Sequence, residues 1–341
     1  MADHKGLQNG DSTKYFYFSG VMMLLCILGL GEGVRAEGNG GFAGSYLRIG
    51  LGAPAKAMGN AQVAVAADGF SNFYNPAVLP FLKNPVAGLS YSFMSLDRRF
   101  NYVGYARALP PRGGFAVGWI YSGVGNIRAY NSRGEDVGEI LHGLHAVYFS
   151  FGMKLPTPFD RDRTGDGSGL QVLSFGISLK LLYERIGDGA DFNYSGKGAG
   201  MDLGVLVHPW ETLWFGYQIR DINSKLKSNT NNIFERGSTL DNRFPLIQKI
   251  GVAWQTPLSW LKVAYDFEWS TAGQEKHHWG LQAAGQGLAA RAGWDDGRLT
   301  LGGGMQVRVY KSVRVLLDYA FVDDVVGEGV SHVFSWQFVF R

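Results

Sequence analysis

The sequence predicts an all-β fold: a transmembrane antiparallel β-barrel of about fourteen strands with an N-terminal plug or hatch segment. Three observations predict it, namely an export signal, repeated segments of period-two alternation, and an unusual composition. Of the 341 residues, 46% are hydrophobic and only 18% are charged, and 49 are glycine. Soluble domains usually carry about 25% charged residues. A barrel in lipid explains the low charge, because alternate residues face lipid and lumen.

The N-terminus has the layout of a cleavable signal peptide over residues 1–36. Two lysines precede an apolar run at residues 21–30, which is too short to span a bilayer as a helix, since that takes about 20 residues. Val34-Arg35-Ala36 then fits the small-x-small cleavage pattern. We therefore predict that the mature chain begins near Glu37, the alternative being an uncleaved membrane anchor.

After the signal, segments of about ten residues alternate between apolar and polar positions and end in turns. In residues 311–321, for example, Val313, Val315 and Leu317 share one face, and Arg314 and Asp318 share the other. Successive strand side chains point in opposite directions, so the two faces meet different solvents. The predicted strands are 87–96, 100–109, 112–122, 143–155, 170–184, 198–208, 212–220, 246–256, 259–269, 276–285, 288–295, 298–308, 311–321 and 331–341.

An even strand count places both ends of the barrel on the periplasmic side, where every second connection should be short. The connections at 109–112, 209–211, 256–257, 285–287 and 309–310 obey this rule. Long connections near 123–142 and 221–245 then fall on the extracellular side, whereas the long connection at 156–169 breaks the rule.

The last strand is rich in aromatic residues on one face, at Phe334, Trp336, Phe338 and Phe340. Such a strand at the C-terminus resembles the recognition signal of the outer-membrane assembly machinery, although Arg341 follows the final aromatic residue. The alternative is the closing strand of a soluble sandwich, which would bury one face in a core and seldom carry so few charges.

The predicted register turns a set of charged side chains toward the lumen, where buried charges need partners. We expect them to pair across the lumen and against the plug, the alternative being a polar conduit. The set is Lys154, Lys180, Lys249, Lys262, Arg291, Arg298, Arg314, Glu184, Asp202, Asp266, Glu268 and Asp318.

Residues 43–82 differ from the rest, being rich in small residues. Asn75 is a good helix N-cap and Pro76 suits the first helical position, so a short helical turn is expected at 76–79 and is expected to stop at Pro80. Small residues allow close backbone packing, which suits a segment folded inside a barrel. We assign residues 37–85 to the plug and 86–341 to the barrel.

This segment resembles the start of the PorV/PorQ family, which is related to FadL-like outer-membrane proteins. Gly200–Gly204 and the following Leu213–Gly216 are similar to the family's mid-barrel hairpin. The chain departs from the family pattern at Pro54 and Val78. The resemblance implies a fourteen-stranded barrel with an internal plug. The matching plug residues are Arg48, Gly50, Gly52, Met58, Gly59, Asp68, Asn75 and Pro76.

The sequence gives little support for an enzyme, a metal site or a cofactor. Cys26, the only cysteine, lies in the signal, so the mature chain has no disulfide or thiolate site. An Asp-rich stretch at 160–167 looks like a calcium loop but has Gln171 where an EF-hand places Glu. His277 and His278 are adjacent and cannot chelate from one regular strand, and His142 and His145 are a weak candidate pair. Neither a nucleophile elbow nor a nucleic-acid-binding pattern is present.

The expected location is the bacterial outer membrane, in contact with its lipids, and three functions remain open. The first, favoured by the resemblance, is a PorV-like accessory platform for type IX-like protein secretion, which would bind secretion components or exported cargo. The second is a FadL-like channel for hydrophobic small molecules, which needs an apolar pocket near the extracellular side. The third is a structural protein with a blocked lumen. The predicted partner contacts are Tyr121, Tyr130, Ile233 and Phe234, because aromatic and apolar side chains supply much interface energy.

Overall fold

The computed structural model describes residues 39–65, 68–155, 172–188, 193–229, 238–310, 312–323 and 329–341. The predicted signal and cleavage site, the 156–169 connection, the Asp-rich stretch, Ile233 and Phe234 lie outside these residues. Among the described residues, no helix has both the length and the apolar character needed to cross a membrane.

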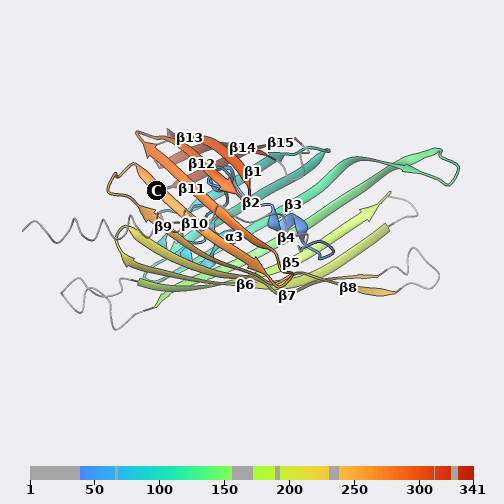
Figure 1. The fold of residues 1–341 in the computed structure, drawn as a ribbon, viewed down its shortest axis with the longest axis horizontal. Helices are drawn as coiled ribbons and strands as arrows, with labels where there is room; N and C mark the ends of the chain where they lie inside the picture. Colours follow the sequence, from blue (N-terminus) through green and yellow to red (C-terminus); the bar gives the residue numbers. More distant parts are fainter. Residues whose placement is uncertain are drawn as a thin grey trace, which may run out of the picture. The chain divides into compact units, whose positions relative to one another are not determined.

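The described chain is a ring of antiparallel strands with a short helical region before it (Figure 1). The helices are η1 (Ser45–Arg48), α2 (Ala53–Lys56), α3 (Ser71–Tyr74) and η2 (Pro76–Phe81). The first strands are β1 (Val86–Phe93), β2 (Arg98–Leu109), β3 (Gly113–Tyr130), β4 (Asp136–Leu155), β5 (Val172–Gly187), β6 (Asn193–Trp210) and β7 (Leu213–Asn229). They are followed by β8 (Thr239–Arg243), β9 (Ile247–Gln255), β10 (Leu261–Ser270), β11 (Glu275–Gly285), β12 (Leu288–Asp295), β13 (Arg298–Tyr310), β14 (Val313–Asp323) and β15 (Val330–Phe340).

The ring closes with fourteen strand positions. The first strand pairs with the last, with Val86 opposite Val339, and β6 pairs with β7 on the other side. Both β8 and β9 pair with β7, β8 along its C-terminal part and β9 along its N-terminal part, so together they fill one position. The predicted fourteen-stranded antiparallel barrel is therefore confirmed. A closed ladder pairs the backbone groups between strands, which is what lipid requires of a spanning sheet.

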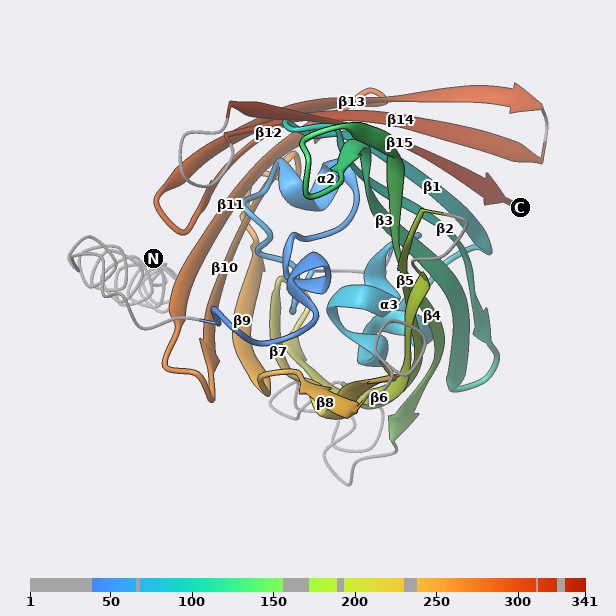
Figure 2. The same ribbon diagram turned by 90° about the vertical axis from the view of Figure 1, so that its right-hand side faces the viewer.

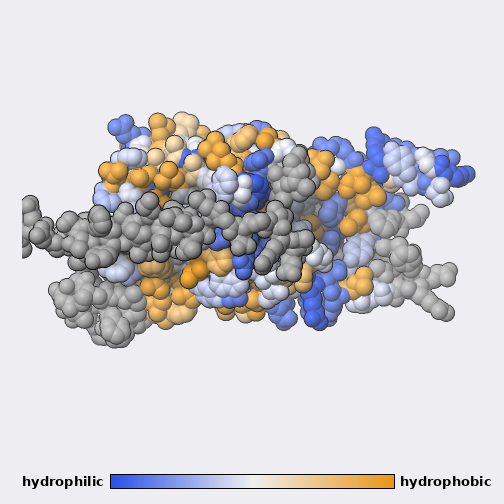
Figure 3. All heavy atoms as spheres, in the orientation of Figure 1, coloured by the Kyte–Doolittle hydropathy of each residue, from blue (hydrophilic) through white to orange (hydrophobic). Residues whose placement is uncertain are grey.

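The outer surface carries the apolar alternation that the sequence predicted. Leu179, Leu181 and Phe149 are exposed on the outside, while Tyr148 and Lys180 from the same strands are buried inside. Apolar residues gather over the wall of strands, and polar residues gather where the β3–β4 hairpin projects (Figure 3). Long loops mark the extracellular end of such barrels, so this hairpin marks that end and both barrel termini lie at the periplasmic end.

Two long connections were predicted as loops, and this was wrong for their described parts. Residues 124–130 and 136–142 continue β3 and β4 as a hairpin, and residues 221–229 continue β7. The continuations were hidden because the pairing slips at β-bulges, between Val124 and Ile127 for example. Asn126 and Asp221 adopt positive φ there, which interrupts the two-residue alternation.

Residues 43–65 and 68–82, here called the inner segment, lie inside the ring (Figure 2). Leu47, Leu51, Phe73 and Leu79 are fully buried. They pack with barrel residues such as Tyr148 and Ala116 into the clusters that form the core. The lumen is therefore filled at its centre by chain rather than left as an open pore.

Candidate functional site

The residues of the PorV-like motif all belong to the inner segment, and three of its glycines have positive φ that favours glycine. Gly50, at φ 88°, faces the Asn60 amide, and Gly52, at φ 81°, precedes α2. Gly59, at φ 61°, lies so close to the wall that a Cβ there would come within 2.5 Å of the Trp294 carbonyl oxygen. These three glycines let the chain turn closely against the barrel.

Asn75 caps the predicted helical turn. Its Oδ1 accepts a hydrogen bond from the Ala77 N–H at 3.0 Å, and Pro76 begins η2. Its Nδ2 also donates to the carbonyls of Val63, at 2.8 Å, and of Val205 in β6, at 3.1 Å. The cap is therefore confirmed, and the same side chain ties the inner segment to the wall. The turn was expected to stop at Pro80, but η2 runs on to Phe81.

Side chains of the wall satisfy backbone N–H groups of the inner segment. Asp266 Oδ2 accepts from the N–H groups of Gln62, at 2.7 Å, and Val63, at 2.9 Å. Ser335 Oγ accepts from the Ala53 N–H at 2.8 Å, and Thr300 Oγ1 accepts from the Gly59 N–H at 3.1 Å. Unpaired buried amides would cost about 1–3 kcal/mol each, so these bonds hold the segment in a defined place.

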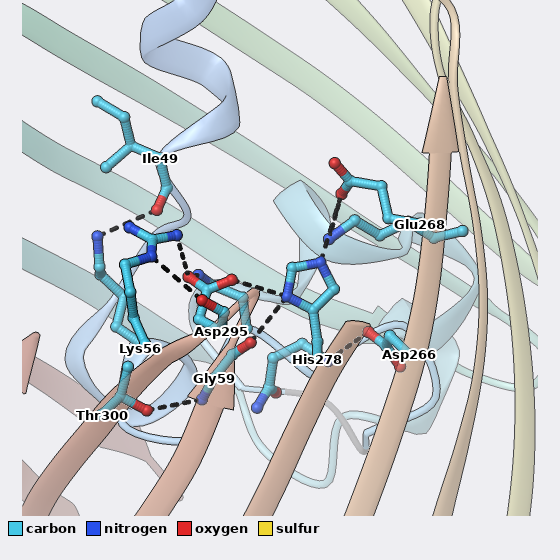
Figure 4. A network of polar contacts seen from close by, with 12 residues as sticks. Ile49, Lys56, Gly59, Asp266, Glu268, His278, Asp295 and Thr300 are labelled. Carbon is cyan, nitrogen blue, oxygen red and sulfur yellow. Dashed lines mark hydrogen bonds and ion pairs between the residues drawn. The ribbon is translucent and has the colours of Figure 1, made fainter. Parts of the chain in front are cut away.

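A buried ionic network lies where α2 and the following turn meet β9, β10, β11 and β12 (Figure 4). His278 Nδ1 lies 2.9 Å from Asp295 Oδ1 and 3.0 Å from the Gly59 carbonyl oxygen. Asn60 Nδ2 donates to Asp295 Oδ2 at 2.8 Å. Lys249 Nζ lies 2.7 Å from Glu268 Oε2. His278 Nε2 lies 3.8 Å from the same Glu268 oxygen, so the network joins four wall strands, β9 to β12, to the turn after α2.

A belt of small residues surrounds the inner segment at all fourteen strand positions. Nine members of the belt are glycines, and each lies so close to the inner segment that an added Cβ would touch it. At Gly114, for example, a Cβ would come within 2.5 Å of the Leu79 carbonyl carbon. The alanines pack in the same clusters as inner-segment residues. The belt consists of Gly88, Ala106, Gly114, Gly152, Gly176, Gly204, Gly216, Ala253, Ala264, Gly280, Gly293, Gly302, Ala320 and Ser335.

Two cavities flank residues 53–62 inside the lumen. The extracellular-side cavity has a volume of about 190 Å³, and of residues 53–62 it is lined by Lys56 and Asn60. The periplasmic-side cavity has a volume of about 340 Å³ and is lined by Pro54, Met58 and Gln62. Side chains from one stretch therefore line both cavities, and we call residues 53–62 the partition between them.

The predicted lumenal charges face the lumen, and several pair as expected. Arg291 Nη1 lies 2.7 Å from Asp318 Oδ1. Lys180 Nζ contacts Asp221 and lies 2.6 Å from Asp202. The lumenal set missed Arg220, at the end of a predicted strand, and Asp221, just beyond it. It also missed His278 and Asp295 in two predicted strands. Strict alternation could have identified Asp295, because it lies on the same face of its strand as Arg291.

The remaining candidates lie apart from the lumen or from one another. His277 and His278 face opposite sides of β11, since the His277 ring bonds Tyr265 on the outer wall at 2.8 Å. Tyr121 lies in β3, where its ring packs 5.2 Å from that of His145, and Tyr130, at the end of β3, is 62% exposed. Among the described residues no cluster of three or more histidine or acidic side chains is placed to hold a metal ion.

Comparison with solved structures identifies the architecture. The match to the toluene transporter TbuX of Ralstonia pickettii covers 86% of this chain and 99% of the transporter chain, with 12% identity and a TM-score of 0.59. The match to the toluene transporter TodX of Pseudomonas putida covers 85% of this chain and 96% of the transporter chain, with 14% identity and a TM-score of 0.55. The match to a FadL homologue of Pseudomonas aeruginosa covers 84% of this chain and 97% of the homologue, with 10% identity and a TM-score of 0.55.

No protein-family model and no curated protein sequence matches the chain. The comparisons therefore identify the fold and leave membership of the PorV/PorQ family as a resemblance. The apolar outer wall and the closed ring agree with this architecture, and the predicted outer-membrane location is confirmed by it. The chain has the fold of FadL-like outer-membrane β-barrels.

Proposed function

We propose that the protein is a FadL-like outer-membrane transport protein, not an enzyme, which lets small molecules cross through its lumen with residues 53–62 as the gate. The observation that carries this proposal is the pair of cavities on either side of the partition. A solute that enters one cavity needs only the movement of one short stretch to reach the other. The fold shared with toluene transporters favours this function over the secretion platform.

We propose a substrate class different from that of the sequence hypothesis. That hypothesis named hydrophobic small molecules and required an apolar pocket near the extracellular side. Among the described residues, half of those that line the lumenal cavity on that side are charged, including Arg48, Lys249 and Glu268. Contact between charged groups and hydrocarbon in place of water costs several kcal/mol, so this cavity favours solutes that carry polar groups.

The gate can be tested by tethering it to the wall. Ala57 of the partition packs against Ala320 of β14 in one cluster of small side chains. In Ala57→Cys/Ala320→Cys, oxidation should stop the swelling of proteoliposomes in small solutes, and reduction of the same sample should restore it. The two single-cysteine variants are the controls. Equal flux in the oxidised and reduced samples, with the cross-link verified, would refute the gate.

The secretion platform is retained as a second candidate because of one observation. The β3–β4 hairpin projects beyond the wall and carries exposed Tyr130, Val137 and Leu141 (Figure 1). Replacing Tyr130, Val137 and Leu141 with serine should abolish surface delivery of exported cargo in this case and leave solute flux unchanged. Unchanged delivery in the strain with these substitutions would count against the platform.

A further inference from the structure

We propose that the extracellular-side cavity binds a compact, multiply charged anion, a small solute bearing phosphate, sulfate or carboxylate groups. This inference deepens the proposed transport function and rests on it for the fate of the bound solute. It depends on three observations: the charge of the lining, the way its cations are held, and a second set of cations beyond the partition.

The lining of the cavity is strongly positive. Two carboxylates, Glu268 and Asp295, face it. The lining cations are Arg48, Lys56, Arg98, Arg220, Lys249, Lys276 and Arg298. With His278 counted as neutral, seven cations therefore face two anions, and the lining remains positive even without Lys56 and Arg98.

Ion pairs inside the protein account for only part of this charge. Lys249 pairs with Glu268 at 2.7 Å, and Arg298 lies 3.5 Å from Asp295. The nearby cluster of Lys180, Asp202 and Asp221 carries one net negative charge and lies next to Arg220 in the chain. It offsets one cation, which leaves a positive excess around the cavity. Cations taken out of water are stabilised when an anion shares their site.

Neutral groups hold two of the arginines. Arg48 Nη1 donates to the Ala43 carbonyl oxygen at 2.9 Å. Arg220 Nη2 donates to the Leu47 carbonyl oxygen at 2.6 Å, and its guanidinium lies 4.4 Å from the centre of the Phe73 ring. Carbonyls and rings orient a guanidinium without cancelling its full charge. Two preorganised arginines suit phosphate and carboxylate groups, which they bind through paired N–H donors.

Cations also line the second cavity, on the far side of the partition. Its lining includes Lys83, Lys262, Arg291 and Arg314, with Asp68 as the carboxylate. Arg291 is paired with Asp318 at 2.7 Å, and the others add to the positive potential. Charges of one sign along a confined passage concentrate the opposite ion, so an anion that passes residues 53–62 meets a favourable potential on both sides.

The volume limits the size of the anion. The cavity holds about 190 Å³, which suits a compact group rather than a long acyl chain, and several cations around so small a space favour more than one negative charge. Neutral hydrocarbons gain nothing from this lining. The geometry therefore assigns a hydrophilic anion to the cavity.

The test measures binding to the purified full-length protein by calorimetry, with inorganic phosphate and citrate as probes. Arg48→Gln/Lys276→Gln should weaken citrate binding about tenfold or more, because each change removes one charge from the lining. Raising the salt concentration should weaken binding to the unaltered protein. Arg128→Gln is the matched control, since this arginine lies on the projecting hairpin with its side chain 66% exposed.

Each outcome separates the inference from the proposed function. Binding lost in the double variant and kept in the control supports the anion site, whether or not proteoliposomes show flux. Binding without flux would keep the anion site and refute transport. Equal citrate affinity in the folded double variant, or flux of neutral toluene by a folded protein that binds neither phosphate nor citrate, would overturn the anion site and leave transport standing.

Discussion

A methyl group at Gly114 would lie 2.5 Å from the carbonyl carbon of Leu79, well inside the 3.5–4.0 Å at which carbon atoms pack. Gly114 is directly opposite Gly152, which is opposite Gly176, which is opposite Gly204, in four adjacent strands. Each of these glycines faces the backbone or a side chain of the 75–80 stretch. Wall and inner segment are therefore fitted to each other in shape along this side of the barrel.

Gly114→Ala should destabilise the folded protein by about 1–3 kcal/mol, the usual cost of overpacking a tight site. The neighbour is backbone and cannot rotate away. The measurement is the temperature at which the folded band in detergent electrophoresis gives way to the unfolded band. Gly285→Ala is the control, because a Cβ there meets nothing within 4 Å and the change should be neutral or stabilising by about 0.5–1 kcal/mol.

Asn75→Ala should cost more than the loss of a helix cap alone, which is about 1 kcal/mol. The substitution removes the acceptor for the Ala77 N–H and both donations to the Val63 and Val205 carbonyls from a side chain that is 0% exposed. Asn75→Ser keeps a capping oxygen and loses the two donations. Serine should therefore fall between asparagine and alanine in the same melting measurement, and equal melting temperatures for all three proteins would contradict this role.

The sequence revealed the wall because lipid and lumen impose opposite demands on neighbouring residues. All fourteen predicted strands are present, and Val147, Phe149 and Phe151 point outward as predicted. The alternation failed where the wall ends. Beyond Val124 the β3–β4 hairpin is largely exposed, so nothing forces a two-residue period there. Beyond Arg220 one face of β7 stays buried, at Leu226 for example, but positive-φ residues shift the register.

The candidate site was harder to predict, for a physical reason. The lumenal register of Lys249 and Glu268 follows from alternation, whereas the positions of Lys56 and Asp221 depend on how the inner segment folds and where β7 bulges. The lone glycines in predicted strands signal a close approach of backbone. Their partners, such as Pro76 for Gly152 and Met58 for Gly280, lie far away in sequence and are known only from the fold.

Lys180→Met should be severely destabilising, by about 3–5 kcal/mol, because it leaves Asp202 and Asp221 buried without their shared cation. Adding Asp202→Asn and Asp221→Asn removes both charges and should recover most of the loss. The melting temperatures of the single and triple variants measure this. Arg128→Met breaks an exposed pair with Asp136 and should cost no more than about 1 kcal/mol.

Asp68 should make the stability of the inner segment depend on pH. Burial raises the pKa of its carboxyl above the usual range, although hydrogen bonds from the Phe70 N–H and Ser71 Oγ oppose the shift. A raised folded-state pKa means that the stabilisation is present in acid and is lost as the pH rises through that pKa. Asp68→Asn keeps an acceptor for Phe70 and should remove this part of the pH dependence. A pH profile identical to that of the unaltered protein would contradict the assignment.

Deleting residues 43–82 should leave a closed barrel and open its lumen. The pairs that close the ring, β1 with β15 and β6 with β7, lie outside the deleted stretch. The deletion takes away Lys56 and Arg48 but leaves Lys249, Lys262 and Arg314 on the wall, together with Asp266 and Glu268. We therefore expect stable conductance in planar bilayers where the intact protein is nearly silent.

The selectivity of this pore distinguishes between two roles for the inner segment. If it only fills space, the cations left on the wall should still give the deleted barrel a clear preference for anions. If it also contributes to selectivity, that preference should be weak, because Arg48 and Lys56 are gone and Asp266 no longer accepts hydrogen bonds from the N–H groups of Gln62 and Val63. Reversal potentials in a salt gradient measure this preference. The deleted protein must still show heat-modifiable migration, so that conductance is read from folded barrels. An intact protein that already conducts like an open porin, with no change on deletion, would show that residues 43–82 do not restrict passage, and both the gate at 53–62 and the barrier between the two cavities would have to be abandoned.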